Sequence, residues 1–252
     1  MIRLYEPQPL SIGQRIILGE RAHHYLCNVL RIKSNEQMTL FNGQGGEYQG
    51  EIIDISKKQV TVAITAFNDR EVESPIAIHL AQGMPKADKL DYIVQKAVEL
   101  GVASITPVVA ERSQGRLSNE QAQKKTTRLS EIVINACEQC GRNRVPNIYS
   151  PQLFAEWLNT TKQHQHRFVL SAHHAKPLQV ESIAPHESIL LLVGPEGGLT
   201  SYELAEAEAA GFIPLRFGER ILRTETASIA ALSVLQWCFG DFRELHFNSF
   251  PV

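Results

Sequence analysis

The sequence has few cysteines and no long apolar run, and both absences narrow the class of protein. Its four cysteines are too scattered for a disulfide framework in a chain of 252 residues. Cys137 and Cys140 form a single C-x-x-C without a second pair at zinc-binding spacing, so they are interpreted as two thiols one helical turn apart. No apolar segment approaches the ~18 residues of a membrane span, and the N-terminal residues contain no signal-peptide core. We therefore expect a cytoplasmic protein.

The chain also lacks an excess of positive charge. It carries 25 Lys and Arg against 27 Asp and Glu, a formal net charge of −2, which excludes a uniformly basic nucleic-acid binder. The charge is nevertheless uneven, because seven basic and three acidic residues lie between Arg112 and Arg144, whereas residues 186–252 contain four basic and nine acidic ones. A local basic patch can bind a polyanion whatever the total charge, although a solvated helix face fits the same counts.

Residues 1–72 are expected to form a small all-β domain. Short alternating apolar runs at 38–41, 49–55 and 59–66 are separated by Asn-Gly, Gly-Gly and Ser-Lys pairs, which is the chemistry of hairpins. Several short strands at this spacing predict a small barrel, with a short helix over residues 22–32. The charged segment 68–75 is interpreted as a linker.

Residues 73–252 are expected to form an α/β domain. Strands that are apolar throughout alternate with helical patterns, and this predicts a parallel sheet covered on both faces. Strands are expected at 76–82, 105–109, 167–172, 189–193 and 213–218, and helices at 88–100, 119–140, 203–210 and 226–239. Trp157 and Trp237 both fall in apolar helical segments and are expected in the core.

A glycine-rich loop follows one of the apolar strands, in the stretch LLVGPEGGLT at 191–200. Loops at the carboxyl ends of parallel strands bind ligands in open α/β sheets, and glycines let the backbone approach a ligand closely. The loop lacks the lysine of a Walker A motif and the spacing of a dinucleotide fingerprint, and Glu196 disfavours a phosphate. A neutral or cationic ligand fits better, although a purely structural turn remains an alternative. Thr200 and Glu203 predict a capping box at the start of the next helix.

A second polar loop, FGERILRTETA at 217–227, precedes the last apolar helix. It leaves the same edge of the predicted sheet, so the two loops are expected to form opposite walls of one cleft. Thr224 and Thr226 could serve only to cap the helix, whereas Arg223 has no obvious structural role.

The pair GPEGG and LRTETA resembles the SPOUT class of S-adenosylmethionine-dependent RNA methyltransferases. Further stretches resemble, more narrowly, the family of ribosomal RNA small subunit methyltransferase E. These stretches are HYLCNVLRI at 24–32, FNGQGGEY at 41–48, KADKLDYIVQKAVELGVASITPVVAERS at 86–113 and ACEQCGRNRVP at 136–146. The resemblance covers nearly the whole chain, and its motifs occur in the family's order.

The resemblance implies a fold that periodicity does not predict. It implies a SPOUT-type knotted parallel sheet, with a C-terminal trefoil knot, and a PUA-like RNA-binding β-barrel at the N-terminus. It also implies a homodimer that methylates N3 of one uridine in 16S ribosomal RNA of the small ribosomal subunit, with no metal. On this resemblance the methyl donor, S-adenosylmethionine, is expected to contact Ser171, Val193, Gly194, Glu196, Gly197, Gly198, Phe217, Gly218, Ile221, Leu222 and Ala227.

The expected reaction needs an acceptor nitrogen that has lost its proton. Uracil N3 is a weakly acidic imide, so a positioned base or a neighbouring cation would help, and the uridine must be unpaired. The candidates are Glu138 as base, Gln139 for pairing with the imide edge, and Arg142 and Arg223 as cations. The alternative role for Glu138, an ion pair with a neighbouring arginine, is favoured over that of base. The expected RNA-binding residues are Arg21, Arg31, Lys33, Arg112, Arg116, Lys124, Lys125, Arg128 and Arg144.

Two other functions remain open at this stage. One is a nucleotide-binding α/β enzyme that uses the glycine loop for phosphate. The other is a non-catalytic RNA-binding module that takes part in ribosome assembly.

Overall fold

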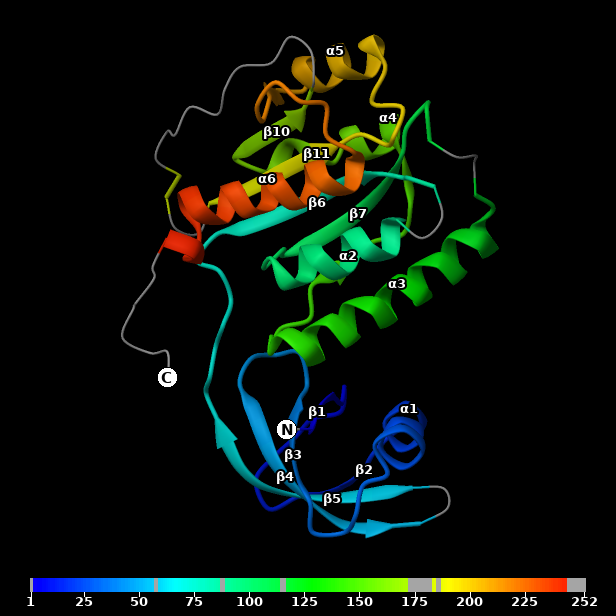
Figure 1. The fold of residues 1–252 in the computed structure, drawn as a ribbon, viewed down its shortest axis with the longest axis vertical. Helices are drawn as coiled ribbons and strands as arrows, with labels where there is room; N and C mark the ends of the chain where they lie inside the picture. Colours follow the sequence, from blue (N-terminus) through cyan, green and yellow to red (C-terminus); the bar gives the residue numbers. More distant parts are fainter. Residues whose placement is uncertain are drawn as a thin grey trace. The chain divides into compact units, whose positions relative to one another are not determined.

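The computed structural model describes residues 2–56, 59–86, 89–113, 117–171, 183–184 and 187–243, and the chain divides into two compact units. Unit 1 comprises Met1–Glu73 together with Ile134–Val145. Unit 2 comprises Ser74–Val133 and Pro146–Val252. The sequence pattern predicts a single boundary near residue 72, whereas unit 1 also contains the internal segment Ile134–Val145. Figure 1 shows the elements of both units.

Unit 1 is built on a five-stranded sheet of order β1-β3-β4-β5-β2. β1 pairs with β3 in parallel, and the other pairs are antiparallel. Its strands are β1 (Ile2–Tyr5), β2 (Arg15–Ile17), β3 (Gln37–Phe41), β4 (Glu47–Ile55) and β5 (Val60–Asn68). Alternate residues such as Leu40, Ile52 and Val62 are fully buried in one core, as the period-two pattern predicts. The predicted hairpin strands are therefore confirmed.

The helical segment of unit 1 is less regular than the sequence indicates. A single short helix is expected over residues 22–32, but the structure has helix α1 (Glu20–His24) continuing into a π-helix, η1 (Tyr25–Leu30). The π-helix ends at Arg31, which adopts the left-handed conformation at φ 53°. Leu26 of this segment is fully buried in the core, so the irregular helix still covers the sheet.

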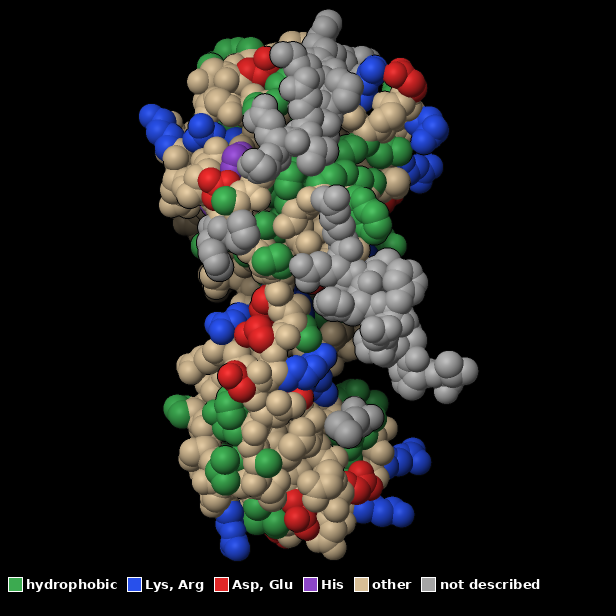
Figure 2. All heavy atoms as spheres, turned by 90° about the vertical axis from the view of Figure 1, so that its left-hand side faces the viewer, with side chains coloured by type: hydrophobic (Ala, Val, Ile, Leu, Met, Phe, Trp, Pro, Cys, Tyr) green, Lys and Arg blue, Asp and Glu red, His purple; other side chains and the backbone are tan. Residues whose placement is uncertain are grey.

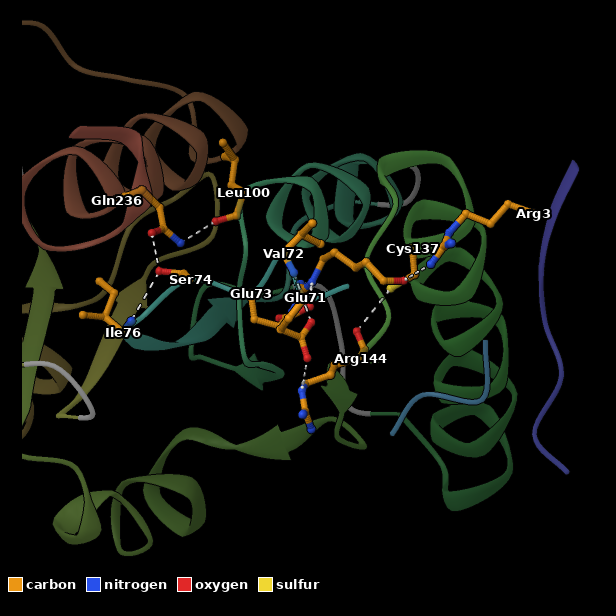
Figure 3. A network of polar contacts seen from close by, with 11 residues as sticks. Arg3, Glu71, Val72, Glu73, Ser74, Ile76, Leu100, Cys137, Arg144 and Gln236 are labelled. Atoms are coloured by element: carbon orange, nitrogen blue, oxygen red, sulfur yellow. Dashed lines mark hydrogen bonds and ion pairs between the residues drawn. The ribbon is translucent and has the colours of Figure 1, made fainter. Parts of the chain in front are cut away.

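The charged segment after β5 is held to the rest of unit 1 by arginines. Arg142 forms an ion pair with Glu73. Arg144 donates from Nε to Glu71 at 2.7 Å (Figure 3). The Arg142 side chain is only 6% exposed. Because a buried charge must be compensated, this pairing anchors the Gly141–Val145 segment to the charged segment that follows β5. The segment interpreted as a linker thus contributes to the packing of unit 1.

Unit 2 contains a seven-stranded parallel sheet, whose main path runs β12-β10-β11-β6-β7-β8, with β9 also paired to β7. Its strands are β6 (Ala77–Gly83), β7 (Ser104–Val109), β8 (Asn147–Ile148), β9 (Gln152–Leu153), β10 (His166–Leu170), β11 (Ser188–Val193) and β12 (Ile213–Leu215). The predicted parallel α/β sheet is confirmed, although the two-residue strands β8 and β9 carry no periodic signal and were not expected.

Helices cover both faces of this sheet, as Figure 1 shows. The helices that follow residue 73 are α2 (Lys89–Glu99), α3 (Asn119–Cys140), α4 (Phe154–Leu158), α5 (Ser201–Ala209) and α6 (Thr224–Phe239). Two single 3₁₀ turns, η2 (Thr161–Gln163) and η3 (Asp241–Arg243), accompany them. α4 and α5 bury Phe154, Trp157 and Ala207 against one face. Among the helices of the described ranges, none combines the length and apolarity of a bilayer span.

Helix α6 packs beside α2 and is fixed there by a buried glutamine. Gln236 is fully buried, accepts from the Ser74 hydroxyl at 2.7 Å and donates to the Leu100 carbonyl at 2.8 Å (Figure 3). Trp157 lies in the core as predicted, but the expectation for Trp237 is wrong, because that side chain is 54% exposed. A helix that is apolar all round gives no pattern that shows which of its residues stay exposed.

A histidine pair lies at the amino edge of the sheet. The rings of His79 and His164 have centroids 4.5 Å apart, and their Nδ1 atoms lie 2.7 Å from the Ser104 hydroxyl and 3.2 Å from the Ser188 hydroxyl. Burial, with a smaller contribution from His164, lowers the pKa of His79 to about 4. Burial and the charge of Arg167 lower the pKa of His164 as well. Both rings are therefore neutral in the folded protein near neutral pH.

This pair predicts a loss of stability in mild acid. As the pH falls below about 6.5, the unfolded chain takes up the His79 proton first, so the free energy of unfolding decreases until about pH 4. Urea unfolding near pH 7 and near pH 5 is expected to show a smaller decrease for His79→Gln than for the wild type. His24→Gln, at an exposed position, is the control. Equal decreases in all three proteins would contradict the prediction.

Candidate functional site

A pocket of about 300 Å³ opens in unit 2 at the carboxyl ends of β10, β11 and β12. Its walls come from the loops that follow these strands, from the first turn of α6 and from Arg112. The lining residues are Arg112, Leu170, Ser171, Val193, Gly194, Pro195, Glu196, Gly197, Gly198, Leu199, Leu204, Leu215, Arg216, Phe217, Arg220, Ile221, Leu222, Thr224 and Ala227. A cavity of this size, lined by apolar side chains together with a few polar groups, suits a small organic ligand.

The structure brings the two loops singled out in the sequence to this one pocket. All residues expected to contact the methyl donor line it except Gly218, which lies between the lining residues Phe217 and Arg220 and has φ +73°. The loops therefore form walls of one cavity, as their position after parallel strands predicts. Their binding of the donor stays a prediction at this point.

The glycine loop is shaped by two close backbone contacts. Gly198 has φ +68°, and its amide donates to the Pro195 carbonyl at 2.8 Å, which closes a tight turn. Gly83, at the end of β6, packs so closely on this turn that a Cβ atom there would lie 2.5 Å from the Pro195 nitrogen. There is therefore no room for a side chain at position 83. Because glycine has none, the loop packs directly on the sheet.

A buried hydrogen-bond network joins the glycine loop to α6. The Thr224 hydroxyl donates to the Gly194 carbonyl at 2.6 Å, and it accepts from Gln82 Nε2 at 3.0 Å. Ser228 donates to Gln82 in turn, and Gln82 and Ser228 are fully buried. Thr224 makes no side-chain cap for α6, so its hydroxyl serves the loop and not the helix end. Three elements distant in sequence are thus fixed around one wall of the pocket.

Glu196 is the acidic residue in the pocket lining, and its carboxylate is compensated. It accepts from the Lys86 amide at 3.1 Å and lies 3.4 Å from the Lys89 ammonium, which also lies 3.3 Å from Glu225. Partial burial opposes ionisation, but the amide hydrogen bonds and Lys89 outweigh it, so the pKa of Glu196 is lowered. The carboxylate is therefore ionised and tethers the glycine loop to the starts of α2 and α6.

The helix after the glycine loop begins with the predicted capping box. Thr200 accepts from the Glu203 amide, and the Glu203 carboxylate accepts from the Thr200 amide at 2.8 Å. Glu203 also accepts from the Glu111 amide at 2.8 Å, which holds the loop after β7 beside the pocket. The next residue, Arg112, donates from Nη1 to the Gly197 carbonyl at 2.9 Å. The prediction of a capping box is confirmed, and it also positions Arg112.

The four candidates for proton transfer and substrate pairing divide between the units. Three of them lie in unit 1. Glu138 accepts from the Tyr5 amide at 3.0 Å and forms a two-point ion pair with Arg21. Gln139 is exposed, and Arg142 forms an ion pair with Glu73. In unit 2, Arg223 is exposed next to the pocket residues Leu222 and Thr224. Its side chain makes no hydrogen bond or ion pair with a residue that the structure describes, although its carbonyl accepts from Ala227.

The basic residues expected to bind RNA have varied surroundings. Arg31 and Lys33 are exposed in unit 1, where Arg21 and Arg144 are engaged with Glu138 and Glu71. On the face of unit 1 drawn in Figure 2, side chains of both charges are interspersed. On α3, Lys124 pairs with Glu120, Arg128 pairs with Asp91, and Lys125 is half-buried. Arg112 lines the pocket, and Arg116 lies outside the described residues.

Several residues that line or support the pocket are not among the predicted site residues. Gln82 and Gly83 end a strand that reads simply as buried, and a polar residue at the carboxyl end of such a strand is the signal that could have identified Gln82. Arg216 falls in the predicted strand 213–218 and Arg220 in the second loop, and neither is among the predicted site residues. In the part of the chain that the structure describes, no three His, Cys, Asp or Glu side chains come together as metal ligands.

Family models match both parts of the chain. An RNA methyltransferase domain matches residues 72–236, and an RNA methyltransferase PUA domain matches residues 18–65. The second match agrees with the small sheet of unit 1, so the chain has an N-terminal PUA-like domain followed by an α/β domain with a parallel sheet.

Curated relatives and solved structures agree with these models. A ribosomal RNA small subunit methyltransferase E from Buchnera aphidicola is 36% identical over 95% of this chain and 97% of its own, and one from Bacillus subtilis is 33% identical over 88% and 89%. A putative methyltransferase from Legionella pneumophila in complex with SAM superposes with a TM-score of 0.90 at 38% identity, covering 96% of this chain and 99% of its own. A ribosomal RNA small subunit methyltransferase E from Neisseria gonorrhoeae, bound to S-adenosyl methionine, gives 0.89 at 38% identity over the same shares. The chain therefore belongs to the family of RNA methyltransferases that contains the ribosomal RNA small subunit methyltransferase E proteins.

Proposed function

We propose that this protein transfers a methyl group from S-adenosylmethionine to N3 of a specific uridine in 16S ribosomal RNA of the small ribosomal subunit. One observation carries the proposal: two loops separated in sequence form a single pocket, in a chain whose relatives from Legionella and Neisseria are described with this donor bound. The name of the Buchnera and Bacillus relatives supports ribosomal RNA as the substrate. Such a substrate places the reaction in the cytoplasm.

The chemistry of the pocket fits the methyl donor. Apolar side chains such as Leu170, Val193 and Leu215 offer a surface for a purine, and the backbone of the glycine loop offers amides and carbonyls for hydrogen bonds. The donor carries a sulfonium cation, which carbonyl dipoles can stabilise. Since the loop has no lysine and holds a carboxylate, a phosphate-bearing nucleotide fits less well. The donor supplies the methyl group, and the protein supplies its position.

Arg223 is the best-supported candidate for contact with the acceptor uracil. Its exposed guanidinium has no protein partner among the described residues, and its backbone leads directly into the pocket residue Thr224. Loss of the N3 proton places negative charge on the neighbouring uracil oxygens. A guanidinium beside them would stabilise that charge and lower the barrier to attack on the methyl group.

The three candidates of unit 1 also remain proposed contacts of the uracil, but their surroundings support them less directly than those of Arg223. Gln139 is exposed and offers the donor and acceptor that the imide edge of uracil requires. Glu138 and Arg142 both hold ion pairs in unit 1, with Arg21 and Glu73. A direct catalytic role for either one requires that pair to open. We therefore rank them below Arg223 as groups that contact the substrate.

We also propose that the C-terminal half is knotted and that the protein is a homodimer. The order of the sheet, with β10 between the later strands β11 and β12, and the return of α6 to α2 and β11 support a threaded chain. Trp237, which is 54% exposed on α6, and Phe242, which is exposed on η3, support a subunit contact. Figure 2 shows hydrophobic side chains gathered on part of the face of unit 2. Large exposed apolar groups of this kind mark interfaces.

The close contact of Gly83 provides a test of the pocket. In Gly83→Ala the added methyl group must displace Pro195 and with it the glycine loop. Calorimetry with S-adenosylhomocysteine is expected to show binding to the wild type and an affinity at least about tenfold lower in the variant, a loss of about 1.4 kcal/mol. Gly19→Ala, where the added methyl group meets no atom within 4 Å, is the matched control. Absence of binding to the wild type would overturn the proposed function.

The candidate arginines are distinguished by separate measurements of turnover and stability. Arg223→Ala is expected to lower kcat by about 10²-fold or more, since it removes a group that acts on developing charge, while donor affinity and unfolding stay unchanged. Arg142→Ala is expected to lower the free energy of unfolding by about 3 kcal/mol, because Glu73 loses its buried partner. Normal turnover in Arg223→Ala, measured with a tritiated donor on unmethylated 16S ribosomal RNA, would remove Arg223 from the site.

The proposed dimer predicts a change of mass in solution. Trp237→Glu places a charge in the exposed apolar surface of α6, and light scattering is expected to shift from twice the chain mass to the chain mass. Tyr202→Glu, at another exposed aromatic position of unit 2, is the control. A wild-type protein that is monomeric at all concentrations would contradict the homodimer.

A further inference from the structure

The mouth of the pocket carries more positive charge than a methyl donor requires. Three exposed arginines, Arg112, Arg216 and Arg220, belong to its lining and are here called the arginine rim. The carboxylate in the lining is that of Glu196, which is engaged with the Lys86 amide and Lys89. The donor carries a sulfonium and an ammonium group beside a single carboxylate, so electrostatics account for at most one of the three guanidinium groups. The rim therefore points to a second, anionic binding partner.

Few of the rim's hydrogen-bond donors are used within the protein. One Nη atom of Arg112 donates a hydrogen bond to the Gly197 carbonyl. Arg216 forms an ion pair with Glu219 three residues later, but the Glu219 side chain is 82% exposed, and such exposed pairs contribute little energy. The Arg220 side chain makes no hydrogen bond or ion pair with any residue in the described ranges. Guanidinium groups with free N–H donors bind phosphate at two points.

The same loop presents an apolar side chain between these charges. Ile221 lines the pocket and is 81% exposed, directly after Arg220. An exposed isoleucine beside arginines offers contact to a base as well as to a phosphate, which is the combination found in nucleic-acid binding surfaces. A simple anion would use the arginines alone, so this combination favours a nucleotide strand.

We propose that the arginine rim holds phosphates of the acceptor RNA strand on either side of the extruded uridine, with Ile221 against an unstacked base. This inference rests on the proposed function and adds the residues that bring the acceptor to the donor pocket. Phosphate contacts fix the register of a strand without selecting its sequence, so the rim sets the position of the target nucleotide. Base selection then falls to other groups, including those near Arg223.

The salt dependence of RNA binding tests this inference. Arg216→Gln and Arg220→Gln each remove one phosphate contact, so each is expected to weaken binding of in vitro transcribed 16S ribosomal RNA roughly tenfold. Each is also expected to reduce the slope of log K against log salt by about 0.7, and the double variant by about 1.4. Lys162→Gln removes one exposed charge of unit 2 that does not line the pocket, and it is expected to leave the slope unchanged.

Donor binding, measured separately, distinguishes the possible failures. Calorimetry with S-adenosylhomocysteine is expected to give the same affinity for the wild type, Arg216→Gln and Arg220→Gln. A loss of donor affinity with unchanged RNA slopes would assign the rim to the carboxylate of the donor and overturn the inference. Unchanged slopes together with unchanged donor binding would overturn it as well, while leaving the methyltransferase function intact. No donor binding by the wild type would instead reject the proposed function.

Discussion

The pocket depends on the hydrogen bond between the Thr224 hydroxyl and the Gly194 carbonyl. It joins the end of β11 to the start of α6, which are 30 residues apart, and Gln82 continues the contact into β6. Buried polar groups destabilise a fold unless each has a hydrogen-bond partner. Removing one of these side chains would therefore weaken the contact among all three elements. The glycine loop then has one defined position, and the cavity beneath it keeps a fixed shape.

Much of the fold follows from local patterns in the sequence. The apolar strands and amphipathic helices of residues 76–239 occur within a few residues of the expected places, because their burial repeats at the period of the backbone. The glycine loop and the loop before α6 could be identified as neighbours, since loops after parallel strands emerge at one edge of a sheet. The capping box of Thr200 and Glu203 is a local interaction over three residues, and such interactions are visible in sequence.

The features that could not be predicted arise from contacts between distant residues. Thr224 fits the pattern of a helix cap, yet its hydroxyl is taken by Gly194 and Gln82. The segment after β5 has the composition of a free linker, but the arginines that neutralise it come from a position some 70 residues later. Tertiary partners of this kind override local preference, and no period or spacing in the chain reports them. The same reason explains why the ion pairs of Glu138 and Arg142 had to be found in the structure.

The tethering of Glu196 has a consequence for the cycle of the enzyme. Its negative charge is balanced by Lys89 and the Lys86 amide, so the described lining offers no unpaired carboxylate to a positive ligand. If the donor binds in this pocket, as proposed, the donor and its demethylated product, which lacks the sulfonium charge, gain similar energy from the walls, since both share the same purine, sugar and amino-acid parts. We expect the spent cofactor to remain bound and to compete with fresh donor. Turnover would then be governed by the ratio of the two in the cell and by the rate at which the product leaves.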